Sequence, residues 1–243
     1  HCEDRARFVT GRLSPAGAAP VSGEYPLVVA IHGGTYTADY FDIAGCSLMR
    51  RAAALGIPLF AVNRPGYLDS LPREKSDGSI DTNARILNDA LQALWEQHGG
   101  KARGIFLIGH SIGGAIAIRM AASPKPWPLL GIAISGVGLR EPDPILEHWK
   151  SLPPGDVIEI PPQPKDALMY GPAGSFRVEA QLAAHRADHP MPRQELLDIA
   201  FEWPRLLDES APKIHVPVHY RQPEFDHLWV VDEGEVQGFG RRF

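Results

Sequence analysis

Residues 104–114 read GIFLIGHSIGG, and this stretch decides the fold of the 243-residue chain. The run GIFLI is short and apolar, which predicts a strand covered on both faces. Residues 112–122 are rich in Ala and Ile and predict a buried helix. Ser111 lies between them in a G-x-S-x-G turn, whose glycines leave room for the strained backbone that a nucleophilic serine needs. The alternative is a glycine-rich turn that carries an ordinary serine.

Strands and helices alternate on both sides of this motif. Further strands are predicted at residues 6–13, 27–31, 59–62, 129–134 and 214–220, and further helices at 39–55 and 80–98. Such alternation predicts an α/β fold, in which a mostly parallel central sheet has helices on both faces.

The alternation stops between residues 141 and 211, where prolines are frequent and helical pieces are predicted at 176–186 and 193–202. A long insertion inside an α/β domain usually carries function, and we expect this one to form a helical lid. The chain then divides into the first part of the core at 1–140, the lid at 141–211 and the rest of the core at 212–243.

A second glycine motif, HGGT at residues 32–35, follows the apolar strand LVVAI. In a serine hydrolase the loop at this place supplies one backbone N–H for the oxyanion, and the residue after the nucleophile supplies the other. The candidates are Gly34, with Thr35 next to it, and Ile112 at the N-terminus of the predicted helix. A turn that only reverses the chain is the alternative for HGGT.

These motifs resemble, in order, those of the α/β-hydrolase superfamily of serine esterases and lipases, without matching a particular member. HGGT is similar to the HG oxyanion motif, and GHSIGG to the nucleophile elbow. NRPGY at 63–67 resembles D-x-P-G-x-G, with Asn63 in place of Asp, and IHVPV at 214–218 resembles the strand before the acid. The resemblance implies an α/β-hydrolase fold and Asp226 as the acid of a catalytic triad. Asp143, just past the fourth strand, is a second candidate acid.

The family order is Ser, acid, His, and only His227 follows Asp226. Adjacent side chains usually diverge, so His227 is a poor partner for Asp226. We therefore expect the catalytic histidine beyond residue 243, together with a last strand and helix. The alternatives are a base from inside the chain and a protein that has lost catalysis.

The resemblance implies hydrolysis of a carboxylic ester, thioester or lactone through an acyl-enzyme on Ser111. An acyltransferase or lyase that uses the same site, and a non-catalytic ligand-binding homologue, are the alternatives. Four residues are candidates for the substrate pocket, with core packing as the other reading of the aromatic ones: Thr35, His110, Trp149 and Tyr170. Trp127 and Trp203 are considered with them.

Composition limits the partners. The net charge is −5 and the pI about 6.1, so no basic surface for nucleic acid and no polybasic membrane patch is expected. Cys2 and Cys46 suit no zinc site, and unpaired thiols are favoured over one disulfide. We expect a small-molecule acyl substrate, no metal, no cofactor, no membrane partner and a cytoplasmic protein.

Overall fold

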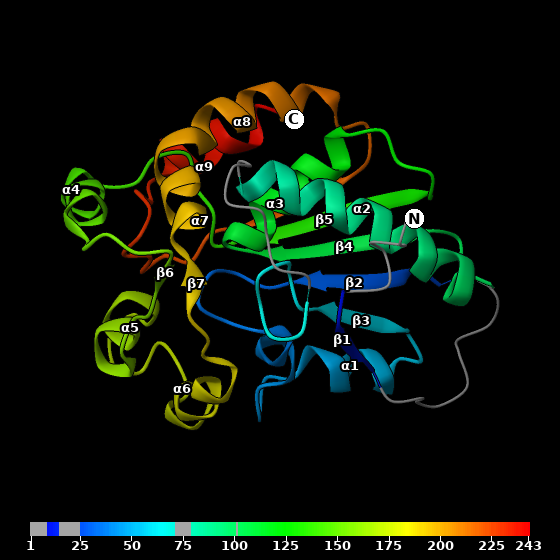
Figure 1. Ribbon diagram of the computed structural model, residues 1–243, viewed down its shortest axis with the longest axis horizontal. Helices are drawn as coiled ribbons and strands as arrows, with labels where there is room; N and C mark the ends of the chain where they lie inside the picture. Colours follow the sequence, from blue (N-terminus) through cyan, green and yellow to red (C-terminus); the bar gives the residue numbers. More distant parts are fainter. Residues whose placement is uncertain (1–8, 15–24, 71–78, 101) are drawn as a thin grey trace.

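A computed structural model describes residues 9–14, 25–70, 79–100 and 102–243 of the chain. Its centre is a six-stranded sheet with the strand order β1-β3-β2-β4-β5-β8 (Figure 1). The strands are β1 (Gly11–Leu13), β2 (Leu27–Ile31), β3 (Leu59–Val62), β4 (Ile105–His110), β5 (Leu129–Ser135) and β8 (Val218–Arg221). Only β1 pairs antiparallel, with β3, and the other neighbours in this sheet are parallel. The predicted mostly parallel sheet is confirmed.

Both faces of the sheet are covered, because side chains alternate along each strand. On β2, Val29 and Ile31 pack into the larger hydrophobic core, while Val28 and Ala30 pack into a smaller one. The helices α2 (Ser79–His98) and α3 (Ile112–Ala122) cover the first face, and α1 (Leu48–Ala54) covers the other (Figure 1).

Three predicted elements differ from the structure. The helix expected at 39–55 is two pieces, the 3-10 helix η2 (Ala38–Asp42) and α1, because Gly45 takes a left-handed conformation with φ 80° between them. The strand expected at 214–220 begins only at Val218, since Pro217 has no N–H for the ladder. Of the strand expected at 6–13, residues 6–8 lie outside the described residues, and β1 is Gly11–Leu13.

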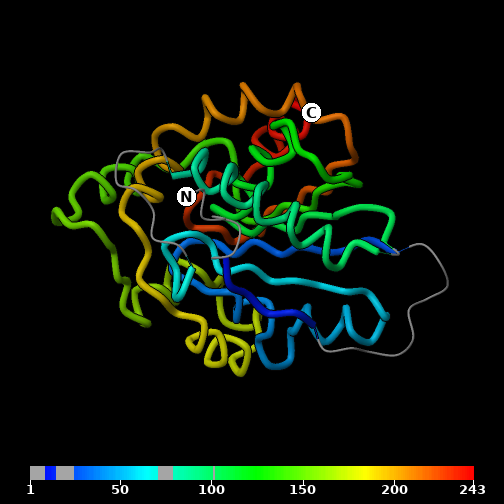
Figure 2. The backbone as a smooth tube through the Cα atoms, turned by 45° about the vertical axis from the view of Figure 1, so that its right-hand side comes forward, coloured from blue at the N-terminus to red at the C-terminus, as the bar shows by residue number. Residues whose placement is uncertain are grey.

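The 141–211 insertion connects β5 to β8. It contains α4 (Asp143–Ser151), β6 (Val157–Ile158), α5 (Pro162–Met169), α6 (Val178–Ala184), η3 (His185–Ala187), β7 (Met191–Pro192), α7 (Arg193–Leu197), the π-helical η4 (Asp198–Glu202), α8 (Trp203–Ser210) and the start of η5 (Ala211–Lys213). Helices α4, α5 and α6 lie beyond the carboxyl ends of the parallel strands (Figures 1 and 2). The insertion therefore lies over the edge where Ser111 is found.

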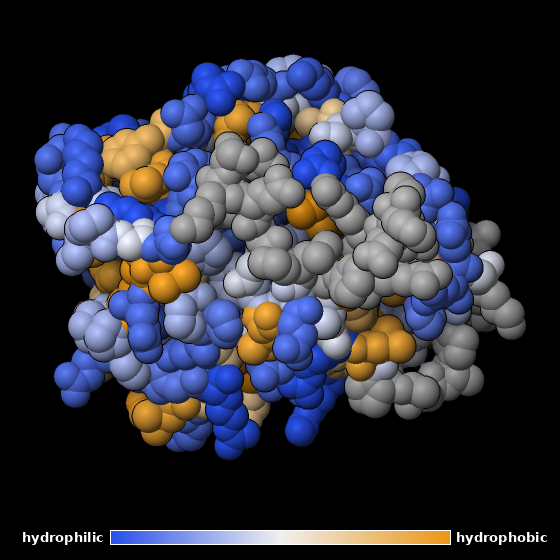
Figure 3. All heavy atoms as spheres, viewed as in Figure 1, coloured by the Kyte–Doolittle hydropathy of each residue, from blue (hydrophilic) through white to orange (hydrophobic). Residues whose placement is uncertain are grey.

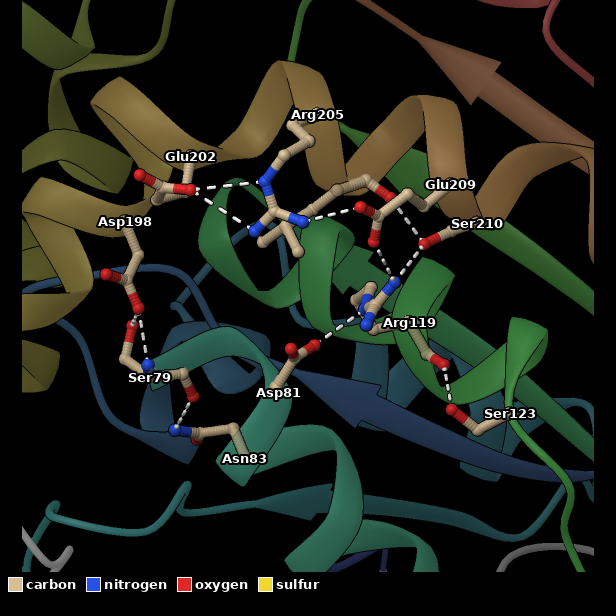
Figure 4. Close-up of polar contacts among 11 residues, drawn as sticks. Ser79, Asp81, Asn83, Arg119, Ser123, Asp198, Glu202, Arg205, Glu209 and Ser210 are labelled. Carbon is tan, nitrogen blue, oxygen red and sulfur yellow. Dashed lines mark hydrogen bonds and ion pairs between the residues drawn. The ribbon is translucent and has the colours of Figure 1, made fainter. Parts of the chain in front are cut away.

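The end of the insertion packs on α2 and α3, the helices that cover the first face of the sheet. Helix α8 lies along α3, and Trp203 and Leu207 are fully buried in the larger core. Figure 4 shows the polar contacts at this junction. The Asp198 carboxylate accepts hydrogen bonds from the backbone N–H and the hydroxyl of Ser79, and so caps α2. Arg119 of α3 binds Asp81 at 2.6 Å and Ser210 at 2.9 Å.

The last helix, α9 (Glu233–Gly240), returns to the sheet beside β8. Phe239 is buried and stacks on Tyr220 with ring centroids 4.1 Å apart.

Hydrophobic residues are dispersed over the face shown in Figure 3. No helix in the described ranges is long and apolar enough to cross a bilayer. Cys46 is exposed and unpaired, while Cys2 lies outside the described residues.

Candidate active site

Ser111 occupies a strained turn between β4 and α3. Its backbone has φ 52° and ψ −126°, which non-glycine residues rarely adopt. A Cβ at Gly109 would lie 2.4 Å from the Gly113 carbonyl oxygen, and a Cβ at Gly113 would lie 2.1 Å from the Ile31 carbonyl oxygen. Both flanking glycines are therefore required by close backbone approach. The turn lifts the serine above the carboxyl end of β4.

The Gly33–Thr35 loop lies directly against this turn. A Cβ built on Gly33 would lie 3.0 Å from Ser111 Cβ, and one on Gly34 would lie 3.0 Å from Ile112 Cδ1. Within the described part of the chain, the backbone N–H groups of Gly34 and Ile112 donate no hydrogen bond. Two unengaged donors thus lie on the two segments that meet at the serine.

Two cavities have Ser111 in their lining. The first is mainly apolar, about 50 Å³ in volume, and is lined by Gly34, Thr35, Ser111, Ile112, Glu141, Trp149, Ile160, Leu168, Met169, Met191, Leu196, Ile199, Leu228 and Trp229. The second has about 210 Å³ and is lined by Tyr36, Tyr40, His110, Ser111, Gly136, Leu168, Met169, Tyr170, Pro223, Phe225, Asp226 and Leu228. Residues of the insertion contribute to both, so a substrate at Ser111 would contact it.

The four predicted pocket residues line these cavities, Thr35 and Trp149 the first, His110 and Tyr170 the second. The other two tryptophans do not. Trp127 is buried in the core, and its Nε1–H donates to the Asn88 carbonyl at 3.2 Å. The indole of Trp203 donates to the Gly138 carbonyl at 2.9 Å. Sequence could not separate these cases, because the large apolar ring and the single N–H of a tryptophan fit a core as well as the wall of a pocket.

Asp226 follows β8 and lines the second cavity with Ser111. Its Oδ2 accepts from Gln222 Nε2 at 2.7 Å and its Oδ1 from the Leu228 N–H at 2.8 Å. Burial raises the pKa of this carboxyl, and the hydrogen bond from Leu228 opposes the rise. Asp143, the second candidate acid, is exposed in the first turn of α4 and lines neither cavity.

Glu141, two residues earlier, is a second carboxylate near Ser111. It lines the apolar cavity, and its Oε2 accepts from Trp149 Nε1 at 2.7 Å. Burial raises its pKa to about 7, with Asp226 contributing in the same direction. No motif in the sequence marks Glu141 as a residue of the site. The one available signal was a carboxylate placed six residues after the end of β5.

No histidine contacts the Ser111 hydroxyl among the described residues, which include every histidine except His1. The His110 ring stacks on Tyr40, with centroids 4.8 Å apart, and burial lowers its pKa to about 4. His32 is fully buried and has a structural role: its Nε2 accepts from the Arg64 N–H, so Nδ1 carries the proton and donates to the Gly33 carbonyl at 2.8 Å. His227 is exposed beside Asp226.

Across the described ranges, no group of three or more His, Cys, Asp or Glu side chains could hold a metal ion.

Comparison with known proteins decides the family. The model of the alpha/beta hydrolase family matches residues 28–233. The chain belongs to this family. Protein phosphatase methylesterase 1 from Bos taurus is 29% identical over 114 residues, which are 47% of this chain and 28% of that protein. Esterase Rv0045c from Mycobacterium tuberculosis is 35% identical over 101 residues, which are 41% of this chain and 29% of that protein. The matched part of this alpha/beta hydrolase thus spans less than a third of the length of these relatives.

Solved structures show the same fold. The esterase EaEST from Exiguobacterium antarcticum superposes with a TM-score of 0.63 at 15% identity, over 96% of this chain and 83% of that one. The M. tuberculosis esterase Rv0045c gives 0.54 at 21% identity, over 97% and 81%. The predicted α/β-hydrolase fold is confirmed for this member of the family.

Proposed function

We propose that this alpha/beta hydrolase is a serine hydrolase that cleaves a carboxylic ester through an acyl-enzyme on Ser111. The observation that carries the proposal is the strained turn at Ser111, set against two free backbone N–H groups, at Gly34 and Ile112. In such an arrangement the serine oxygen attacks the acyl carbon, and the two N–H groups stabilise the charge on the carbonyl oxygen. Relatives named as esterases support the ester as substrate class.

The two cavities suggest how the substrate lies. The apolar cavity is lined by Gly34, Ile112 and Ser111 together with apolar side chains such as Trp149, so it suits the hydrocarbon part of an ester. The larger cavity contains Asp226, which in this proposal orients the histidine of the triad and stabilises its charged form. The 141–211 insertion acts as the lid, because its side chains line both cavities.

The test uses the full-length protein, a fluorophosphonate probe and a short-chain p-nitrophenyl ester. We expect one probe to add at Ser111, and Ser111→Ala to abolish both labelling and turnover. Asp226→Asn should lower kcat by about 10⁴-fold, as loss of a triad acid does. Asp143→Asn is the matched control and should leave kcat unchanged, because Asp143 lines neither cavity.

Turnover that survives Ser111→Ala would refute the acyl-enzyme on this serine. A folded wild-type protein that binds an acyl ligand but stays unlabelled would instead support a non-catalytic ligand-binding protein. Adding an alcohol to the assay separates the remaining alternative, since an acyltransferase would form a new ester in place of the free acid.

A further inference from the structure

Two buried cations hold the loop that carries the Gly34 N–H. The first is Arg64, from the segment after β3, whose Nη2 donates to the Gly33 carbonyl at 3.1 Å. That carbonyl also accepts from His32 Nδ1 at 2.8 Å, so both of its lone pairs are engaged. In a trans peptide the C=O and the following N–H point in opposite directions. Fixing the Gly33 oxygen therefore fixes the direction of the Gly34 N–H.

The second cation is Lys165 of α5, which is 1% exposed. Its Nζ donates to the Thr35 carbonyl at 2.7 Å, and the His189 N–H donates to the same oxygen at 3.0 Å. Thr35 itself has φ 58°, a conformation that a β-branched residue holds only where its surroundings impose it. The two cations thus bind the first and last carbonyls of the three-residue loop.

Each cation is paired with a carboxylate of the 141–211 insertion. Arg64 and Glu195 of α7 are both fully buried and form a bidentate pair, at 2.8 and 2.9 Å, to which the Tyr67 hydroxyl adds a hydrogen bond of 2.9 Å. Lys165 lies 2.5 Å from Asp188. None of these side chains lines either cavity at Ser111. Arg64 and Lys165 therefore contact the loop without lining the space around Ser111 where a substrate would bind.

We propose that the Arg64–Glu195 and Lys165–Asp188 pairs are positioning elements by which the insertion sets the Gly33–Thr35 loop in its catalytic geometry. The inference rests on the proposed function, in which Gly34 is an oxyanion donor. Burying an ion pair usually adds little to stability compared with apolar side chains of similar size, so the contacts that these cations make with the loop, rather than a gain in stability, indicate their role. Loss of one oxyanion donor lowers kcat by about 10²–10³-fold in serine hydrolases, which is the upper limit for its misplacement here.

Two variants test the proposal, and each removes one of the two contacts between a cation and a loop carbonyl. Lys165→Met keeps the aliphatic stem and deletes the donor to Thr35. The triple variant Arg64→Met, Tyr67→Phe, Glu195→Met replaces the whole buried cluster with apolar groups and leaves no charge unpaired. We expect kcat for a short-chain p-nitrophenyl ester to fall by about 10–100-fold in each, because the Gly33–Thr35 loop that carries the Gly34 N–H loses a contact at one of its ends, while KM stays within about threefold of wild type.

The matched control is Arg205→Met, in α8 of the same insertion. Arg205 is exposed and pairs with Glu202 at 3.2 Å and Glu209 at 2.5 Å (Figure 4), and neither contact involves the Gly33–Thr35 loop. It should change neither kcat nor KM. Thermal unfolding of all the variants, and hydrogen exchange of the peptide that contains residues 33–36, accompany the kinetics. Exchange should quicken in the two test variants and not in the control.

The outcomes separate the two proposals. A wild-type protein without turnover or labelling refutes the proposed function, and with it the positioning role. An active wild type whose two folded variants keep its kcat refutes the positioning role alone. So does a fall in kcat that only follows the folded fraction, or a loss expressed wholly as a higher KM.

Discussion

Replacing Ser111 by glycine should make the protein more stable than replacing it by alanine. Ser111 has φ 52° and ψ −126°, where a Cβ is strained by about 1–3 kcal/mol. Both substitutions remove the hydroxyl, but only glycine removes the Cβ and with it the strain. Glycine also loses about 0.5–1 kcal/mol more backbone entropy on folding. The net gain of Ser111→Gly over Ser111→Ala is therefore about 0.5–2 kcal/mol.

Urea unfolding at equilibrium measures this difference. With a slope of about 3 kcal/mol per M, the midpoint of Ser111→Gly should lie roughly 0.2–0.7 M above that of Ser111→Ala. The matched control is Ser123, which ends α3 with an ordinary φ of −87°. There glycine should be the less stable of the two variants, because only its entropy changes.

A midpoint for Ser111→Gly equal to or below that of Ser111→Ala would refute the reasoning. It would mean that the turn stores no strain at Ser111, or that the surrounding glycines relax to absorb it. Loss of activity in both variants is expected in any case and does not bear on this point.

Two further predictions concern neighbouring residues. Gly113→Ala should destabilise by about 3 kcal/mol or more in the same urea assay, because its Cβ would lie 2.1 Å from the Ile31 carbonyl oxygen, whereas Gly100→Ala meets nothing within 4 Å and should be tolerated. Burial raises the pKa of Glu141 from 4.5 to about 7, so the folded state binds the proton of this carboxyl more tightly than the unfolded state does. The free energy of unfolding of the wild type should therefore fall by about 3 kcal/mol as the pH rises from 4.5 to 7. Glu141→Gln should abolish this loss when urea midpoints are compared at pH 5 and pH 8, and an unchanged pH dependence would contradict the assignment.

The sequence by itself determined most of the sheet and the strained turn that carries Ser111. The strands at 27–31 and 59–62 were predicted residue for residue, because parallel strands buried on both faces are continuous apolar runs. The turn at Ser111 and its contact with the Gly33–Thr35 loop were predicted from the glycine motifs, since a strained turn and a close approach of two backbones admit few other residues. These features depend on local geometry, which a short stretch of sequence records.

Only the tertiary structure decided what lies around the serine. Arg64 and Glu195 are 131 positions apart, and nothing in the local pattern of either indicates a buried ion pair. The choice of Glu141 over Asp143 as the carboxylate in the cavity depends on where the chain turns into α4. Likewise, Trp149 lines the cavity while Trp203 packs in the core, although both lie on helices of the insertion. Such contacts join segments distant in sequence, and they are fixed only when the insertion packs against the sheet.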